Sequence, residues 1–245
     1  MNYFAHAIRF LDRPWFMAGT AIPDWLNVVD RKCRVRRKNV LAGLPELSGV
    51  ERDVALGIVQ HLDDDQWFHV TPAFFECTND LAVAFRSHLG PDDAWHCGFL
   101  GHIVLELLLD AELIRRNPDL LEQYYTAFQA IDPRMVADVV SRLATIPAPG
   151  LSQLIPLYVE ERFLADYLDD RRLLHRLNQV MRRVKLPALP GSTVDVLAWS
   201  RELVAVQSPQ LLPENHFLPA GALPDAAPSS EKGCTGANAP ELRGT

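Results

Sequence analysis

The chain has 245 residues, of which 48% are hydrophobic and 22% charged, so it can bury the core of one large domain or two small ones. Its net charge of −7 disfavours nucleic acid as a partner, and its four cysteines without a CxxC pair argue against a disulfide framework. No stretch approaches the ~18 uninterrupted apolar residues of a membrane span, and the N-terminus lacks a signal-peptide pattern, so we expect a cytoplasmic protein.

Helical periodicity dominates the first 207 residues, and Pro or Gly separates the successive helices. The pattern predicts helices over 2–11, 14–21, 23–30, 31–42, 49–70, 73–89, 94–116, 118–131, 133–146, 150–168, 169–185 and 192–207. Pro72, Pro118 and Pro133 mark three of the starts, because the N–H that proline lacks has no intrahelical partner in the first turn. We therefore predict an all-α fold, with a single compact multi-helix domain over 1–207.

The composition changes at about Ser208. From there the chain is rich in Pro, Gly, Ala and Ser and has no helical period. Such a segment has little to bury, so we predict a disordered tail over 208–245. His216 and Cys234 lie in it, and we assign them no chemistry.

A first polar stripe lies in the segment GIVQHLDDDQWFH. His61, Asp65 and His69 follow one another at intervals of four and therefore share one helix face. Neutral imidazole combined with carboxylate suits Mn²⁺, Fe²⁺ or Zn²⁺. The alternative is a solvated acidic run at 63–65 close to the end of a helix.

A second stripe lies in FLGHIVLELLLDAELI, where His102, Glu106 and Asp110 are the polar residues of a largely apolar helix. Ionised side chains that face an apolar interior are costly unless they are paired or bind a metal. The alternative is an amphipathic helix whose polar stripe faces solvent. His6 in NYFAHAI and Asp24 in GTAIPDWL are weaker signals, because a lone core histidine and an aspartate at a helix start are both common.

Taken in order, MNYFAH, GTAIPDW, GIVQHLDDD and LELLLDAEL resemble the acyl carrier protein phosphodiesterase family. The family's blocks read MNFLAH, G-N-L-L-x-D-F, G-I-x-x-H-R-x-I-D and L-D-x-x-x-D-H-F-L, and the resemblance covers roughly residues 1–130. It implies an all-helical, HD-phosphohydrolase-like fold and manganese-dependent release of 4′-phosphopantetheine from acyl carrier protein. It places His6, Asp24, His61 and Asp65 on the family's His and Asp positions, Glu106 where the family has Asp, and Asp110 on the next Asp.

The chain also departs from this family. Ala111 stands where the family has His, Leu62 and Asp63 where basic residues usually follow the first His, and His69 where a Thr-Asp pair commonly supplies Asp. His102 is an additional histidine that could take over the missing ligand role. The chain thus resembles a divergent member with a rebuilt ligand set, which either keeps metal chemistry on a different phosphoester or has lost activity.

We expect a divalent metal, Mn²⁺ first and Zn²⁺ or Fe²⁺ as alternatives. The candidate ligands are His6, Asp24, His61, Asp65, His69, His102 and Asp110. Asp64 and Glu106 are the candidates for the general base. The predicted function is that of a metal-dependent phosphodiester hydrolase, which cleaves a phosphoester with a metal-activated water.

The run RKCRVRRK at 31–38 concentrates positive charge in an acidic chain. Its basic residues are Arg31, Lys32, Arg34, Arg36, Arg37 and Lys38. We expect this patch to contact phosphate or an acidic carrier protein; the alternative is a solvated helix face.

Two other functions stay open. One is a catalytically inactive helical binding module that uses this basic patch, and the other is a zinc-dependent phospholipase-like or nuclease-like hydrolase. Metal content would separate the binding module from the hydrolases. Residues 118–207 carry leucines and aromatic residues at helical intervals, to which we assign packing and no site.

Overall fold

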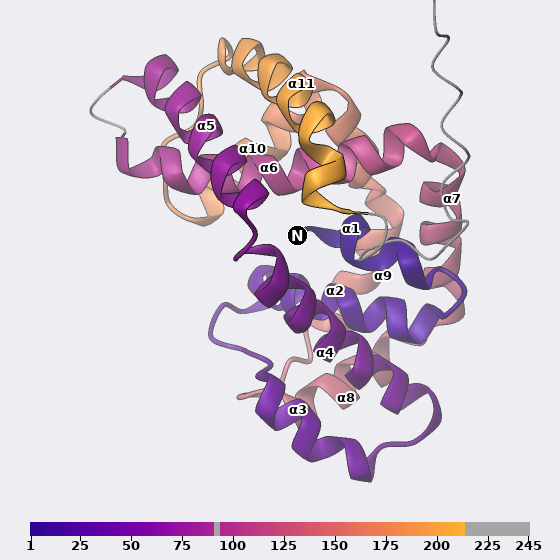
Figure 1. Cartoon of the computed structure of the whole chain (residues 1–245). Coiled ribbons are helices and arrows are strands. Elements are labelled where there is room, and N and C mark those ends of the chain that lie inside the picture. Colours follow the sequence, from indigo (N-terminus) through magenta and orange to yellow (C-terminus); the bar gives the residue numbers. More distant parts are fainter. Residues whose placement is uncertain (91–93, 214–245) are drawn as a thin grey trace, which may run out of the picture.

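The computed structural model describes residues 1–90 and 94–213, which form a bundle of helices (Figure 1). In chain order the helices are α1 (Tyr3–Ala7), α2 (Pro14–Val29), α3 (Arg37–Gly43), α4 (Gly49–Phe68), α5 (Pro72–Leu89), α6 (Ala94–Arg116), α7 (Pro118–Ala127), α8 (Pro133–Leu143), α9 (Leu151–Glu161), α10 (Asp170–Arg183) and α11 (Thr193–Leu211). Short 3₁₀ turns follow α1, α3, α7 and α9 at Ile8–Phe10, Leu44–Glu46, Phe128–Ala130 and Phe163–Leu168. Across the described residues no β-strand is present, so the all-α prediction is confirmed.

Several simpler expectations also agree with the structure. Helices α5, α7 and α8 begin at the predicted prolines. Cys33 and Cys77 are buried free thiols, and Cys97 is buried as well. In the part of the chain that the structure covers, every helix is too short or too polar to cross a membrane.

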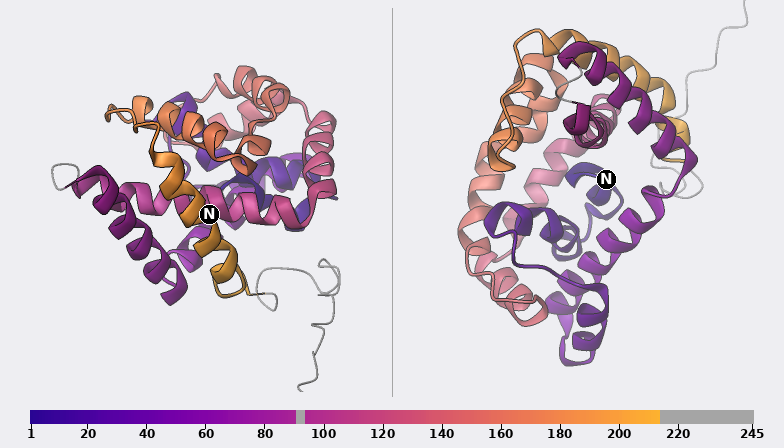
Figure 2. Two further views of the ribbon diagram at one scale, coloured as in Figure 1. Left: turned by 90° about the horizontal axis from the view of Figure 1, so that it is seen from above. Right: turned by 90° about the vertical axis from the view of Figure 1, so that its left-hand side faces the viewer.

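Helix α1 lies at the centre of the bundle. All five of its residues are buried, and it contacts α2, α4, α6 and α7. In Figure 1, α2, α3, α4 and α8 lie on one side of α1, and α5, α6, α10 and α11 lie on the other. The right-hand view of Figure 2 shows the chain start surrounded by the other helices. A short helix that is apolar on all sides is stable only in such a position.

Asp110 of α6 holds the first turn of α1. Its Oδ2 accepts the backbone N–H of Phe4 at 2.9 Å, and its Oδ1 accepts that of Ala5 at 2.7 Å. The side-chain amide of Asn2 donates to Oδ2 at 3.0 Å. These N–H groups have no partner within the helix, so a buried carboxylate from another element serves as their cap.

Two glycines let α2 and α4 cross at very short range. A Cβ added at Gly57 would lie 2.0 Å from the carbonyl oxygen of Phe16, and one added at Gly19 would lie 2.2 Å from that of Val54. Any side chain at either position would collide with backbone, so the crossing requires glycine on both helices. This crossing sets the position of His61, one turn after Gly57, against the backbone of α2.

The predicted break between 14–21 and 23–30 is wrong, because α2 continues through Pro23. Proline removes one intrahelical hydrogen bond and strains the preceding turn, at a cost of about 3 kcal/mol. Trp25 and Leu26, beyond the proline, are almost fully buried, and each contributes roughly 1.5–3 kcal/mol. Packing therefore outweighs the local penalty.

The predicted helix over 31–42 is also wrong in its first half, because α3 begins only at Arg37. Val35 forms an isolated antiparallel bridge with Ala144. Next to it, the N–H of Arg34 donates to Thr145 Oγ1 at 3.1 Å, and the N–H of Thr145 donates to the carbonyl oxygen of Arg34 at 2.9 Å. The part of the basic run around Arg34 and Val35 is thus extended and is hydrogen-bonded to Thr145, which follows α8.

The predicted helix over 150–168 ends early, at Glu161. Arg162 adopts the left-handed conformation (φ 45°), and a 3₁₀ turn follows. Its guanidinium lies 4.5 Å from the ring centroid of Tyr125 and pairs with Glu122. Cation–π attraction and an ion pair thus accompany a conformation that is unfavourable for a residue with a Cβ.

The predicted start of the tail at 208 is too early. Helix α11 continues to Leu211, whose side chain is fully buried. The rest of the predicted tail, from 214 to 245 and including His216 and Cys234, lies outside the described residues.

We predict that Gly57→Ala lowers the free energy of unfolding by roughly 1–3 kcal/mol, because the new methyl group collides with the backbone of α2. Urea denaturation followed by far-UV circular dichroism would measure the change. Gly98→Ala in α6 is the matched control, because a Cβ there meets nothing within 4 Å. This control should gain about 0.5–1 kcal/mol from helix propensity, and equal stability of the two variants would contradict the tight crossing.

Candidate metal centre

The structure groups six of the predicted residues into two clusters that could each hold a metal ion. We call His6, His61 and Asp65 the inner cluster, and His69, His102 and Glu106 the outer cluster. In each, three ligand atoms lie within 4.8 Å of one another. Each cluster offers two imidazole nitrogens and one carboxylate, a donor set that Zn²⁺, Fe²⁺ and Mn²⁺ use in proteins.

The inner cluster is formed by α1 and α4. The Nε2 atom of His6 lies 3.2 Å from Asp65 Oδ1, and that of His61 lies 3.3 Å from Asp65 Oδ2. The two imidazole rings are stacked with their centroids 3.8 Å apart. Burial alone would raise the pKa of Asp65, but the contacts with His6 and His61 outweigh it and hold that pKa well below its usual range. The carboxylate is therefore ionised and faces both imidazoles.

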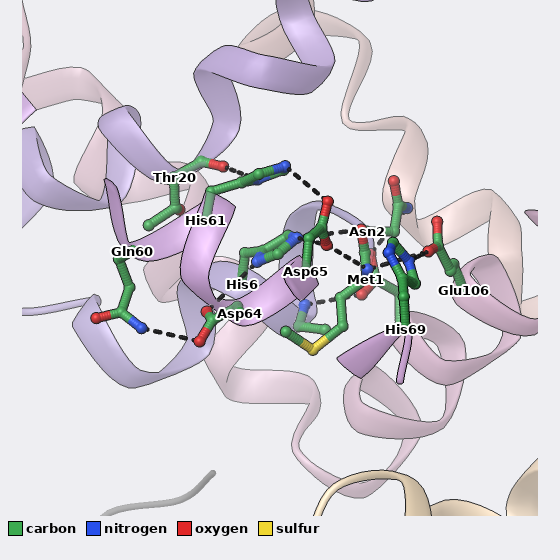
Figure 3. A network of polar contacts seen from close by, with 12 residues as sticks. Met1, Asn2, His6, Thr20, Gln60, His61, Asp64, Asp65, His69 and Glu106 are labelled. Carbon is green, nitrogen blue, oxygen red and sulfur yellow. Dashed lines mark hydrogen bonds and ion pairs between the residues drawn. The ribbon is translucent and has the colours of Figure 1, made fainter. Parts of the chain in front are cut away.

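In both histidines of the inner cluster, Nε2 faces Asp65, and the other ring nitrogen, Nδ1, contacts a group that fixes the orientation of the ring (Figure 3). His61 Nδ1 lies 2.7 Å from the carbonyl oxygen of Thr20. A carbonyl only accepts, so Nδ1 donates to it, and Nε2, which faces Asp65, is the nitrogen that could bind a metal. His6 Nδ1 lies 3.4 Å from Asp64 Oδ2, while its Nε2 lies 3.1 Å from the carbonyl oxygen of Met1, a contact that a metal at Nε2 would replace. Such partners fix the tautomer and the ring plane of metal-binding histidines.

Asp64 lies on the Nδ1 side of His6 and does not belong to either cluster. It accepts hydrogen bonds from Gln60 Nε2 at 2.8 Å and from the guanidinium of Arg9. Burial raises its pKa, but His6 and Arg9 together hold the pKa below its usual value. With its oxygens engaged in this way, Asp64 has the position of an orienting group, which differs from the general base that the sequence predicted.

The outer cluster joins the end of α4 to α6. The Nε2 atoms of His69 and His102 lie 2.9 Å and 3.0 Å from the same oxygen, Glu106 Oε1. Both rings contact Phe74, with centroids 4.8 Å and 5.1 Å away. Burial raises the pKa of Glu106, but the Met1 ammonium and the two histidines hold it well below its usual value. Glu106, which the sequence predicted as a general base, is thus one of the three candidate ligands of the outer cluster.

One nitrogen atom connects the two clusters. The α-amino group of Met1 donates to Asp65 Oδ1 at 2.8 Å and to Glu106 Oε1 at 3.0 Å (Figure 3). Burial lowers the pKa of this group, but the two carboxylates raise it to about 10. A positive charge therefore lies between a carboxylate of each cluster, and the clusters belong to one site.

Asp24 lies beside both clusters. Its pKa is raised to about 7, mainly by burial and also by the nearby carboxylates of Asp65 and Glu106, while His61 opposes the rise. Its Oδ2 is buried and has no hydrogen-bond partner among the described residues. An unpartnered carboxylate oxygen at this place can accept a proton or bind a cation.

A cavity of about 560 Å³ leads to this site, and Asp24 and Glu106 line it. Its wall is largely apolar and includes Trp25, Val28, Ile103, Leu107, Leu157 and Phe163. Four arginines also line it, Arg31, Arg34, Arg176 and Arg183. The cavity therefore offers apolar contact together with positive charge next to the candidate metal centre.

The remaining predicted residues lie elsewhere. Asp110 caps α1, and burial raises its pKa to about 7 although two backbone N–H groups donate to it. Arg37 donates to Asp63 at 2.6 Å on the surface. Lys32, Arg36 and Lys38 are exposed and do not line the cavity. Of the basic run, only Arg31 and Arg34 reach the cavity.

Several groups that orient the histidines or line the cavity were not among the predicted site residues. Arg9, one turn after His6, and Gln60, one turn before Asp64, carried a usable signal, because their spacing places them beside these residues on a helix. The carbonyl of Thr20 had no signal, since its contact depends on the crossing of α2 and α4. Arg183 comes from the half to which we assigned packing alone.

Comparisons of the chain with protein-family models, with curated proteins and with solved structures gave no match. The resemblance to acyl carrier protein phosphodiesterases therefore stays a prediction. The geometry of the two clusters and of the cavity is what bears on function.

We predict that Asp110→Ala destabilises the fold by at least about 2 kcal/mol, because two buried N–H groups of α1 lose their acceptor. Chemical denaturation would measure the loss. Asp138→Ala on the exposed side of α8 is the control, and should change stability by no more than about 0.5 kcal/mol. Equal effects of the two substitutions would show that Asp110 does not hold α1.

Proposed function

We propose that the protein is a metal-dependent phosphoester hydrolase. The observation that carries this proposal is the placement of two His–His–carboxylate clusters beside a cavity that arginines line. Catalytic metal sites commonly use three protein ligands and leave a coordination position for water or substrate. The inner cluster fits such an ion, since both of its imidazoles have orienting partners and its carboxylate is ionised.

Each part of the site has a task in this reaction. A bound divalent ion supplies Lewis acidity, which lowers the pKa of water and offsets charge on phosphoryl oxygens. Asp24, with its unpartnered oxygen and a pKa of about 7, accepts the proton of the attacking water. Arg31, Arg34 and Arg183 attract the anionic substrate, and the apolar wall excludes bulk water.

The cavity favours a phosphoester that carries an elongated apolar arm. Its walls are mostly apolar, whereas the groups near the clusters are charged. The 4′-phosphopantetheine arm of an acidic carrier protein, which the family resemblance implies, is elongated and has apolar segments between its amide groups, so it is a candidate substrate. The exposed basic residues outside the cavity offer a surface for the acidic carrier itself.

The second candidate is a binding module that keeps the fold without catalysis. The basic residues at the cavity support it, because anion binding needs no metal. Stoichiometric metal and metal-dependent turnover distinguish the hydrolase from the module.

We expect His61→Ala to lower Mn²⁺-dependent hydrolysis of bis-p-nitrophenyl phosphate by at least about 100-fold, because the variant loses a ligand held by Thr20. Elemental analysis of the same preparations should show loss of metal. His175→Ala, on the exposed face of α10, is the matched control and should keep both properties. Unchanged metal content and turnover in His61→Ala would refute the proposal.

Two neighbouring arginines test the substrate cavity. Arg183 lines it and Arg182 does not, although both are exposed on α10. We expect Arg183→Gln to raise KM for an alkyl p-nitrophenyl phosphate roughly tenfold, which corresponds to about 1.4 kcal/mol of lost binding. Arg182→Gln removes the same charge and should leave KM within about twofold of the wild type. Equal KM values for the two variants would place substrate binding elsewhere.

A further inference from the structure

We infer that the outer cluster is a second metal site, and that the protein binds two divalent transition-metal ions in one centre. The family resemblance does not imply this site, since two of its members, His69 and His102, stand at positions where the chain departs from the family. The binding of a second ion follows from geometry alone. Its role in catalysis rests on the function proposed above.

The outer ligand atoms converge on one point. Both imidazole Nε2 atoms lie within 3.0 Å of the same oxygen of Glu106, although the two histidines come from α4 and α6. Their rings are 4.8 Å apart and both pack on Phe74, which fixes their planes. Two nitrogens and one oxygen held in this way match the two-histidine, one-carboxylate set of divalent metal sites.

The outer cluster is also open enough to bind substrate. The side chains of His69 and His102 are 31% and 43% exposed, while that of Glu106 is 15% exposed and lines the cavity. An ion held by these three residues would keep positions for solvent or for a phosphoryl oxygen. The inner histidines, by contrast, are buried.

The two clusters are close enough to act on one substrate. Asp65 of the inner cluster and Glu106 of the outer cluster both lie within hydrogen-bonding distance of the Met1 nitrogen. Two-metal hydrolases hold their ions about 3.5–4 Å apart, where they stabilise the attacking and the leaving oxygen of an in-line displacement. Because both carboxylates contact one nitrogen, the two candidate sites are neighbours, and ions bound there would take over the charge compensation that the Met1 ammonium provides.

The two sites should differ in affinity. Each inner imidazole has an orienting partner on its second nitrogen, Thr20 or Asp64. No contact of this kind is present for His69 or His102 among the described residues, and both rings are more exposed. Because orienting partners typically contribute 10–100-fold to metal affinity, we expect the outer site to be weaker by that factor.

Calorimetric titration of metal-free protein with Mn²⁺, combined with elemental analysis after equilibrium dialysis, tests this inference. The wild type should bind two ions in two steps. His102→Gln, which keeps a polar side chain of similar length, and His69→Gln should each lose the weaker step and keep the tighter one. His61→Gln should lose the tighter step, and His175→Gln is the control that should keep both.

Electron paramagnetic resonance supplies a second readout that does not depend on turnover. Two neighbouring Mn²⁺ ions should give an exchange-broadened spectrum, which His102→Gln should replace with that of an isolated ion. A wild type that binds one ion, or outer variants that still bind two, would overturn the inference. A protein that binds two ions but hydrolyses no phosphoester would retain this inference and refute the proposed function.

Discussion

The close crossing of α2 and α4 at Gly19 and Gly57 is the constraint on which the site depends. Backbone meets backbone there, so the distance between the helices is set by atoms that cannot rearrange as side chains do. One residue after Gly19, the carbonyl of Thr20 meets His61, which lies one turn after Gly57. The contact between α2 and α4 therefore also orients the imidazole of His61, a candidate metal ligand.

Helix α1 adds the second condition, which is electrostatic. It brings His6 between two carboxylates of α4, and its own first turn is capped by the buried Asp110. Ionised Asp65 and Glu106 would be costly in this interior without compensating charge. Imidazoles and the Met1 ammonium compensate them in the structure, and divalent ions would do so more strongly. The same charges that make the site expensive to form make it suited to cations.

Much of the helical framework could be predicted from local pattern, and α6, with the predicted bounds 94–116, is the clearest case. The predicted helix break at Pro23 is wrong because the burial of Trp25 depends on residues far away in the sequence. The predicted helix over 31–36 is wrong because Val35 pairs with the distant Ala144. In the site, spacing identified Asp65 as a ligand candidate. Spacing could not show that Asp64, which lies ~100° further around the same helix, faces Arg9. It also could not show that the candidate ligands divide into two clusters.

Helices α1 and α4 place His6, His61 and Asp65 around one point, where we propose that a divalent ion binds. The most direct test is a crystal structure of the protein grown with Mn²⁺, with diffraction data collected at the manganese absorption edge. We expect an anomalous peak within bonding distance of both Nε2 atoms and of the Asp65 carboxylate. Anomalous density absent from this position, with the three side chains still bonded to one another, would contradict it.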